Sequence, residues 1–397
     1  MAERRWLCGL AALVLAALSL TGCWDRIEIN NRGFVVGVSV DEAPQKEDGE
    51  GQGTSPPFRL CYQLVVPGGQ TGGSDSSKGS IGYSNLCAEA ANLSAFHQYA
   101  TDKLSRPPFY DHLKVVVISD KVAKQGHSFS DALDFFLRSA NVRRSIKILV
   151  ARGQASNSLN AKSPNEDLPA SDLENISGTG SSLDKPPAST IGYIHERLMN
   201  ETSFVVQSLA SEGESIRFSG CAIFDGRTNR HVGALDARQT IGRNLMLGFP
   251  VHGTLGIKSG ASVVSFSFYD IRRRLHADVR DPQRIVFDVA VSVTVSVGEV
   301  TGPQLDLSDS AMIARLQADA KAEIEAMIDD TVTAVRRDIR KDALGLGEFL
   351  KRNHYRTWRK IAGNWDEGDE LMSRCVVNVH ANVSIRQIGI VDMSQRI

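Results

Sequence analysis

The feature that most constrains the fold is a long run of alternating residues in the last third of the chain. Apolar side chains occupy every second position, and small or polar side chains fill the positions between them. The apolar positions are Ile285, Phe287, Val289, Val291, Val293, Val295 and Val297. Because successive side chains of a β-strand point to opposite faces, this alternation predicts one long, half-buried strand. Residues 377–385 repeat the pattern, and Val264, Phe266 and Phe268 indicate a third strand.

A long amphipathic helix is expected between the two alternating runs. It should begin near Asp306 or Ser308 and be terminated by Gly345 and Gly347. Its apolar residues recur at spacings of three and four, which places them on one stripe of a helix. These residues are Ile313, Leu316, Ala320, Ile324, Met327, Val335 and Ile339. Packing of this stripe on the chain's own sheet is the simpler prediction, and a coiled-coil partner is the alternative.

The order of the expected elements indicates an α+β protein, with several α+β domains in series and mainly antiparallel sheets. The C-terminal domain should contain the long strands, packed by the long helix. The expected parts are a lipoprotein signal peptide at 1–22, an N-terminal α+β domain at 23–153, a linker or surface excursion at 154–189, a middle domain at 190–256 and a C-terminal α+β domain at 257–397. The segment 154–189 is assigned as a linker or a long surface excursion with short helical pieces, because it is rich in Ser, Asn, Gly and Pro.

Local patterns add shorter elements to this division. Strands are expected at 33–41, 58–66, 113–118, 146–151, 219–226 and 231–235. Helices are expected at 85–104, 121–125, 129–138 and 193–212, from apolar residues at helical spacing.

The first residues of the chain predict export. Arg4 and Arg5 precede an almost wholly apolar run over residues 6–20, and small residues lead from it into Cys23. This order is typical of a secretory signal peptide. The run is shorter than the roughly 20 residues that a transmembrane helix requires. A Leu-Thr-Gly-Cys sequence at its end is typical of lipoproteins, so we expect cleavage between Gly22 and Cys23. The alternative is an ordinary secretory signal with an incidental cysteine.

Lipidation at Cys23 would determine where the protein works. Its sulfur would carry a diacylglyceryl group, with or without an N-acyl lipid on the new amino terminus. Two acyl chains hold a protein on a bilayer stably, whereas one chain holds it only marginally. We therefore expect a body anchored by lipid to the outer face of the cytoplasmic membrane, with the membrane as its first partner.

The charge balance argues against a nucleic-acid partner. The chain has 45 Lys and Arg residues against 46 Asp and Glu residues, and it has no polybasic tract. The short basic run at 272–274, with Arg280 and Arg284 nearby, would suit anionic headgroups. Solvated charge at strand ends is the simpler interpretation of this run.

Four cysteines remain once the signal peptide and Cys23 are set aside: Cys61, Cys87, Cys221 and Cys375. None of them forms a Cys-x-x-Cys or zinc-like pair. An exported chain permits disulfides, and four cysteines allow three pairings. Because widely dispersed cysteines are more often small core residues, we expect no disulfide.

No motif for catalysis or metal binding is present. The chain lacks a phosphate-binding P-loop, a nucleophile elbow and a His-Glu-x-x-His pair. Its nine histidines are scattered without ligand spacing. Gly345-Leu346-Gly347 looks like half of a dinucleotide fingerprint, but it follows a helix where such a site requires a strand. We therefore expect no enzyme, no catalytic residue, no metal ligand and no cofactor beyond the lipid.

Several segments resemble the Ger(x)C lipoproteins, the C subunits of bacterial spore nutrient germinant receptors. The resembling segments are 22–28 (GCWDRIE), 112–118 (HLKVVVI), 133–138 (LDFFLR), 142–144 (VRR), 220–224 (GCAIF), 232–235 (VGAL), 342–347 (DALGLG), 358–359 (WR) and Trp365. The last three are the most specific. They make Asp342, Gly345, Gly347, Trp358 and Trp365 family-motif residues, expected to be structural. The two tryptophans are expected to pack the C-terminal helix against its sheet, and partner binding is the alternative.

The resemblance implies a non-enzymatic subunit on the outer surface of the inner spore membrane. It further implies that the subunit acts with membrane-embedded A and B subunits in the response to nutrients, and it leaves open whether this subunit contacts a nutrient. A membrane-anchored extracytoplasmic solute-binding lipoprotein is the alternative, for which two repeated βαβ lobes would be expected. An exported hydrolase would need a nucleophile or metal constellation.

Overall fold

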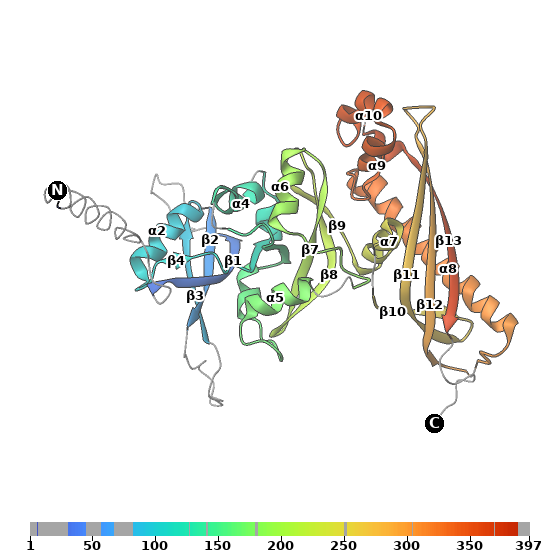
Figure 1. Cartoon of the computed structure of the whole chain (residues 1–397), viewed down its shortest axis with the longest axis horizontal. Coiled ribbons are helices and arrows are strands. Elements are labelled where there is room, and N and C mark those ends of the chain that lie inside the picture. The colour runs from blue at the N-terminus through green and yellow to red at the C-terminus, as the bar shows by residue number, and fades with distance from the viewer. Residues whose placement is uncertain are drawn as a thin grey trace.

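The computed structural model describes Trp6 and residues 31–44, 57–66, 82–126, 128–139, 142–178, 182–249, 252–303, 305–368 and 370–387. Most of the expected signal peptide, together with Gly22 and Cys23, lies outside the described residues. Two β-sheets with packed helices make up the described chain (Figure 1). The α+β class is confirmed, and so are the long strands packed by a long helix in the C-terminal part.

The first sheet has the strand order β3-β2-β1-β5-β6-β7-β8-β9, with β4 paired to β1. Its strands are β1 (Gly33–Glu42), β2 (Phe58–Val66), β3 (Gly82–Ala90), β4 (Pro108–Phe109), β5 (Val115–Ser119), β6 (Lys147–Arg152), β7 (Phe204–Glu212), β8 (Ser215–Phe224) and β9 (His231–Leu235). The central pairs β1–β5, β5–β6 and β6–β7 are parallel, and the pairs on either side are antiparallel. Strand β5 is buried along its whole length, as a parallel strand covered on both faces should be.

Helices cover both faces of this sheet. On one face lie α2 (Leu93–Lys103), α4 (Ser128–Arg138) and α6 (Ile191–Met199), which bury Phe96, Phe136 and Ile194 in a common core. The short helix α3 (Asp120–Lys124) adds Val122 and Ala123 to the same core. On the opposite face, the 3₁₀ helix η2 (Ala155–Asn160) and α5 (Pro169–Gly178) pack against the strands.

Residues 154–189 are therefore not a linker. Leu159 and Leu173 are buried against the sheet, and Gln63 of β2 fastens both helices to it. The Gln63 side-chain amide donates to the Leu159 carbonyl at 2.6 Å and accepts from the Ala170 amide at 2.9 Å. The short helical pieces expected in this segment are present. Polar composition alone suggested a linker, because these short helices need only a few apolar residues to cover an already formed sheet.

The expected boundary at 153 does not separate two sheets either. Strand β7 pairs in parallel with β6, with Val150 opposite Ser208, so the strands of the expected middle domain extend the N-terminal sheet.

Two expected helices are shorter than the patterns suggested. The segment 85–104 is strand β3 up to Ala90, and α2 begins only after Asn92, whose side chain accepts from the Ala95 amide as an N-cap. The segment 193–212 contains most of α6 and then strand β7. Short apolar runs cannot be assigned to helix or strand by periodicity alone, and here pairing with neighbouring strands decides.

The second sheet has the order β10-β11-β12-β13. Its strands are β10 (Thr254–Ser259), β11 (Ser262–Asp278), β12 (Val286–Thr301) and β13 (Val376–Gln387). In β12 the apolar residues of the alternating run are buried, which confirms the predicted half-buried strand. The long helix α8 (Ser310–Thr333) packs its apolar stripe, with Leu316, Ala320 and Ile324, on this sheet.

Helix α8 continues as a short π-helix, η3 (Ala334–Ile339), and short helices follow it at one end of the second sheet (Figure 1). These are α9 (Leu346–Asn353), α10 (Tyr355–Ile361), η4 (Ala362–Asn364) and α11 (Leu371–Arg374). Among the described residues, none of the helices combines the length and the hydrophobicity needed to cross a membrane.

Helix α7 (Ala237–Leu247) joins the two sheets (Figure 1). Gly242 lets it approach α8 closely, since a Cβ there would lie 2.3 Å from the Met327 carbonyl oxygen. Strand β8 contributes to the cores on both sides: Phe224 faces α4 and α6, whereas Ile223 belongs to the core of the second sheet. The two sheets therefore share a packed interface.

One pair of cysteines corrects the expectation of no disulfide. Cys61 of β2 and Cys87 of β3 lie directly opposite each other and are bonded, with their Cα atoms 4.1 Å apart. Cys221 and Cys375 are free and buried. The spacing of the cysteines in the sequence did not indicate this pair. The two cysteines meet because of the register in which β2 pairs with β3.

We predict that removing this disulfide lowers stability without preventing folding. The bond closes a loop with a sequence separation of 26 residues, which corresponds to a stabilisation of about 2–4 kcal/mol. Urea unfolding of the double variant Cys61→Ala/Cys87→Ala should show this loss. A reducing agent should destabilise the unmodified chain and leave the double variant unchanged. Equal sensitivity of both proteins to the reducing agent would contradict the assignment.

Candidate functional site

The segment 342–347 folds around the carboxylate of Asp342, which is buried. Its Oδ1 accepts hydrogen bonds from the backbone N–H groups of Leu344 at 3.2 Å and Leu346 at 3.0 Å. Its Oδ2 accepts from the Gly347 N–H at 2.6 Å and from the indole Nε1–H of Trp365 at 3.0 Å. The carboxylate thus satisfies the first amides of α9 and attaches the following tryptophan to them.

Two glycines make this arrangement possible. Gly345 has a φ of +68°, a left-handed conformation that turns the chain into α9 without strain. A Cβ on Gly347 would lie 2.7 Å from Trp365 Nε1 and 3.0 Å from Trp358 Cη2, so a larger residue would push both indoles away. Trp365 is buried and meets Phe287 of β12 edge-on, with ring centroids 6.4 Å apart. All of the family-motif residues therefore meet in one cluster, hereafter the Asp342 cluster.

Neighbouring polar residues connect the Asp342 cluster to the first sheet. Lys341 Nζ pairs with Asp225 Oδ2 at 2.9 Å and with Glu367 Oε1 at 2.6 Å. Asp225 directly follows β8 and is itself buried. Ser203, just before β7, donates its hydroxyl to Asp366 Oδ2 at 2.7 Å. These contacts hold the end of the first sheet against the loop that carries Asp342.

Asp366 is the residue of this group with the most altered acidity. Its Oδ1 accepts from the Asp342 backbone N–H at 3.0 Å, which brings the two carboxyl groups close together. Burial is the main cause that raises the pKa of Asp366 to about 7, and the negative charge of Asp342 adds to it. The Ser203 hydroxyl and the Lys341 ammonium act in the opposite direction. A carboxyl in this environment changes its charge near neutral pH.

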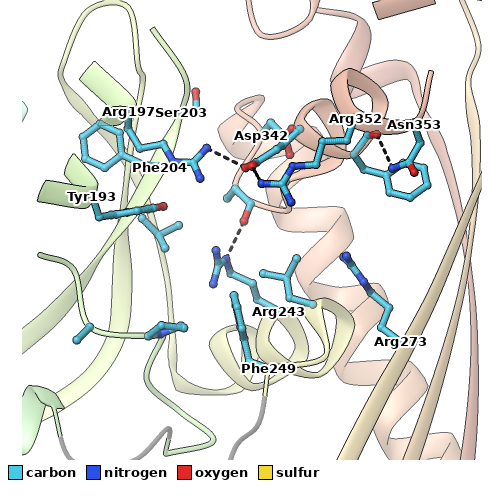
Figure 2. A pocket seen from close by; sticks show the side chains of 18 residues that line it. Tyr193, Arg197, Ser203, Phe204, Arg243, Phe249, Arg273, Asp342, Arg352 and Asn353 are labelled. Carbon is cyan, nitrogen blue, oxygen red and sulfur yellow. Dashed lines mark hydrogen bonds and ion pairs between the residues drawn. The ribbon is translucent and has the colours of Figure 1, made fainter. Parts of the chain in front are cut away.

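A cavity of about 590 Å³ lies beside the Asp342 cluster, between the two sheets (Figure 2). Four arginines come to its wall from four elements: Arg197 from α6, Arg243 from α7, Arg273 from β11 and Arg352 from α9. Glu348 pairs with Arg197 at 3.0 Å and also with Arg352. Arg243 donates from Nε to the Ala343 carbonyl oxygen at 2.7 Å. Three of the four arginines are thus held in place by contacts with the protein, and Glu348 and Asp342 are the acidic residues of the lining.

The two free cysteines of the described residues are not activated as nucleophiles. Burial raises the pKa of the Cys375 thiol to about 12 and also raises that of Cys221, so both stay protonated at neutral pH. Across the described ranges, no group of three or more His, Cys, Asp or Glu side chains could hold a metal ion. The absence of catalytic and metal-binding residues stays a prediction, as do cleavage after Gly22 and lipidation of Cys23, which lie outside the described residues.

Sequence reasoning found the Asp342 cluster by its motif, but it missed the residues around it. Lys341, Asp366 and Ser203 lie in no recognisable spacing, and only the fold brings them together. Successive residues of the basic run at 272–274 have different surroundings in β11. Arg272 is exposed and pairs with Asp270 at 2.7 Å, whereas Arg273 lines the cavity. One signal was available for Arg243, a charged residue two positions before the apolar run Leu245-Met246-Leu247.

We predict that Asp342→Asn destabilises the protein by about 3 kcal/mol. The amide can still accept through its oxygen, but its NH₂ group would face N–H donors of Gly347 and Trp365 and leave them unsatisfied. The free energy of unfolding in urea measures the loss. Asp338→Asn, at an exposed position of η3, is the matched control and should change stability little. Equal stabilities of the two variants would contradict the role assigned to Asp342.

We predict that Asp366 makes stability fall as pH rises from about 4 to about 7. Its pKa of about 7 in the native protein lies above the value of about 3.9 in an unfolded chain, so the native state binds more protons between these values. Asp366→Asn should remove this component and flatten the profile. Burial lowers the pKa of His97 and His231, which gives both proteins the same opposite contribution. Parallel profiles for the two proteins would refute the assignment.

Comparison with known proteins gives a consistent result for both halves of the chain. Residues 25–210 match the family model described as "Spore germination protein N-terminal domain". Residues 219–389 match the one described as "Spore germination B3/ GerAC like, C-terminal".

Individual relatives and one solved structure agree with these matches. Spore germination protein YndF of Bacillus subtilis (strain 168) is 24% identical over 98% of each chain. Spore germination protein B3 of the same organism is 23% identical over 88% of this chain and 90% of its own. The crystal structure of the GerBC protein shares the fold, with a TM-score of 0.59 and 20% identity over 88% of this chain and 97% of that one. The chain belongs to the Ger(x)C family of spore germination proteins.

Proposed function

We propose that this chain is a non-enzymatic, lipid-anchored subunit of a spore nutrient germinant receptor, required with membrane-embedded A and B subunits for germination. The observation that carries the proposal is the pair of family matches, which together extend from residue 25 to residue 389 with one short interruption. Spore germination proteins YndF and A3 align along nearly their whole length, so the whole chain, and not one borrowed domain, resembles them.

The lipid anchor is the second part of the proposal. The first family match begins at residue 25, two positions after Cys23, as expected if the mature protein starts at that cysteine. The first described strand begins at Gly33, so the chain between anchor and body spans at most about 35 Å. The folded body would therefore stay close to the outer surface of the inner spore membrane, within reach of membrane-embedded partners.

The alternative of a solute-binding lipoprotein fits the architecture less well. Two repeated βαβ lobes would have similar strand orders. The sheets described here differ in strand order and in their helices: the first is covered on both faces, and the second is packed by α8.

We predict that Cys23→Ala impairs germination. Spores lacking the gene should be complemented with the unmodified gene, with Cys23→Ala, or with Cys8→Ala, which changes a cysteine inside the expected signal peptide. Dipicolinic acid release after nutrient addition measures the response. Cys23→Ala should restore it poorly and Cys8→Ala fully, because only Cys23 is lipidated.

Two results would count against the proposal. Full restoration by Cys23→Ala would refute the need for the anchor. A normal response of deletion spores to every nutrient class, in a strain without paralogous receptors, would refute the receptor assignment.

A further inference from the structure

The cavity between the two sheets contains an arginine whose hydrogen-bonding capacity is only partly used. Arg243 is 7% exposed, and its Nε is held by the Ala343 carbonyl oxygen. Its Nη1 is buried and has no hydrogen-bond partner among the described residues. The side chain nevertheless lies on the cavity wall, with its guanidinium group toward the interior (Figure 2). A buried cation with an unsatisfied donor is costly unless an anion accompanies it.

Arg273 is a second arginine of the cavity whose positive charge is not paired with an acidic side chain in the described part of the chain. It reaches the same cavity from β11, and within the described residues it forms no ion pair. Burial lowers the pKa of both Arg243 and Arg273, which reflects the cost of keeping positive charge at this place.

The acidic groups of the cavity are already engaged by other partners. Glu348 pairs with Arg197 and Arg352, and Asp342 is surrounded by N–H donors. Positive charge therefore remains in excess at the wall formed by α7 and β11.

Much of the remaining lining is apolar, beside the polar side chains of Tyr193, Ser203 and Asn353. Phe204 and Val205 of β7 contribute from the first sheet, and Leu247 and Phe249 from α7 and its end. The volume of about 590 Å³ is in the usual range of small-molecule sites, which combine apolar walls with a few convergent polar groups. A ligand that fits both features has an anionic end and an apolar body.

We propose that this cavity binds a small organic carboxylate, whose charged end is held by Arg243 and Arg273 and whose apolar part lies against Phe204 and Phe249. A guanidinium group matches a carboxylate because its planar N–H groups donate in pairs to the two oxygens. The ligand contacts both sheets, so its binding also stabilises their interface. This proposal concerns the folded chain alone and does not depend on the germination role.

The test is calorimetric titration of the full chain, purified in a non-ionic detergent, with acetate, hexanoate and 3-phenylpropionate at constant ionic strength. Hexanamide, which keeps the apolar chain and lacks the charge, is the neutral control. We expect saturable binding of at least one carboxylate with an apolar body, and weaker or no binding of acetate and hexanamide. The variant Arg273→Gln should weaken carboxylate binding about tenfold or more, because it removes charged hydrogen bonds.

The matched control is Arg272→Gln, which removes the same charge from the adjacent residue of β11. The Arg272 side chain is 80% exposed and pairs with Asp270, so its loss should leave binding unchanged. No binding of any of the three carboxylates at millimolar concentration would overturn the proposal. Equal losses in the Arg272 and Arg273 variants would do the same, as would equal binding of hexanoate and hexanamide. None of these outcomes would affect the germination proposal, which spores test separately.

Discussion

The buried carboxylate of Asp342 is the interaction on which the organisation of the C-terminal half depends. An ionised group in the interior is stable only if its lone pairs are used, and here backbone amides of the turn into α9 and one indole use them. The same contacts fix the turn at Gly345, the start of α9 and the position of Trp365 over β12. Lys341 and Asp366 lie on either side of this network. The network therefore also positions these two side chains, which contact the first sheet.

The two sheets behave as one packed unit because secondary structure elements are shared between their cores. Strand β8 places alternate residues into two cores. Helix α7 packs between the two sheets, with Gly242 against α8. This part of the interface is apolar and shape-dependent, unlike a polar interface between domains that move independently, and the Lys341–Asp225 ion pair adds a polar contact beside it. The cavity lined by arginines is therefore enclosed by elements whose relative positions are already determined, which is the usual condition for a preformed ligand site.

The success of the sequence predictions follows the length of each pattern. The alternation in β12 and the stripe of α8 extend over many residues, so local periodicity alone specified them, and the structure has both. The segment 193–212 and the supposed linker at 154–189 carry short or weak patterns, and contacts with distant strands determined their structure. The disulfide and the surroundings of Asp342 depend on strand register and on residues far apart in sequence, for which a single sequence gives no signal.

The charged residues between the two sheets fall into two groups, one with a structural role and one available to a ligand. Asp342, Glu348 and Lys341 form their hydrogen bonds and ion pairs with other groups of the protein. A structural role is therefore enough to explain these three residues. Arg243 keeps a buried Nη1 donor without a partner, although its Nε donates to the Ala343 carbonyl oxygen and its guanidinium group lies over the Phe249 ring. A hydrophobic residue of similar size would fill the same space at lower cost. An arginine at this position is therefore better explained by something that the cavity accepts than by the packing of α7.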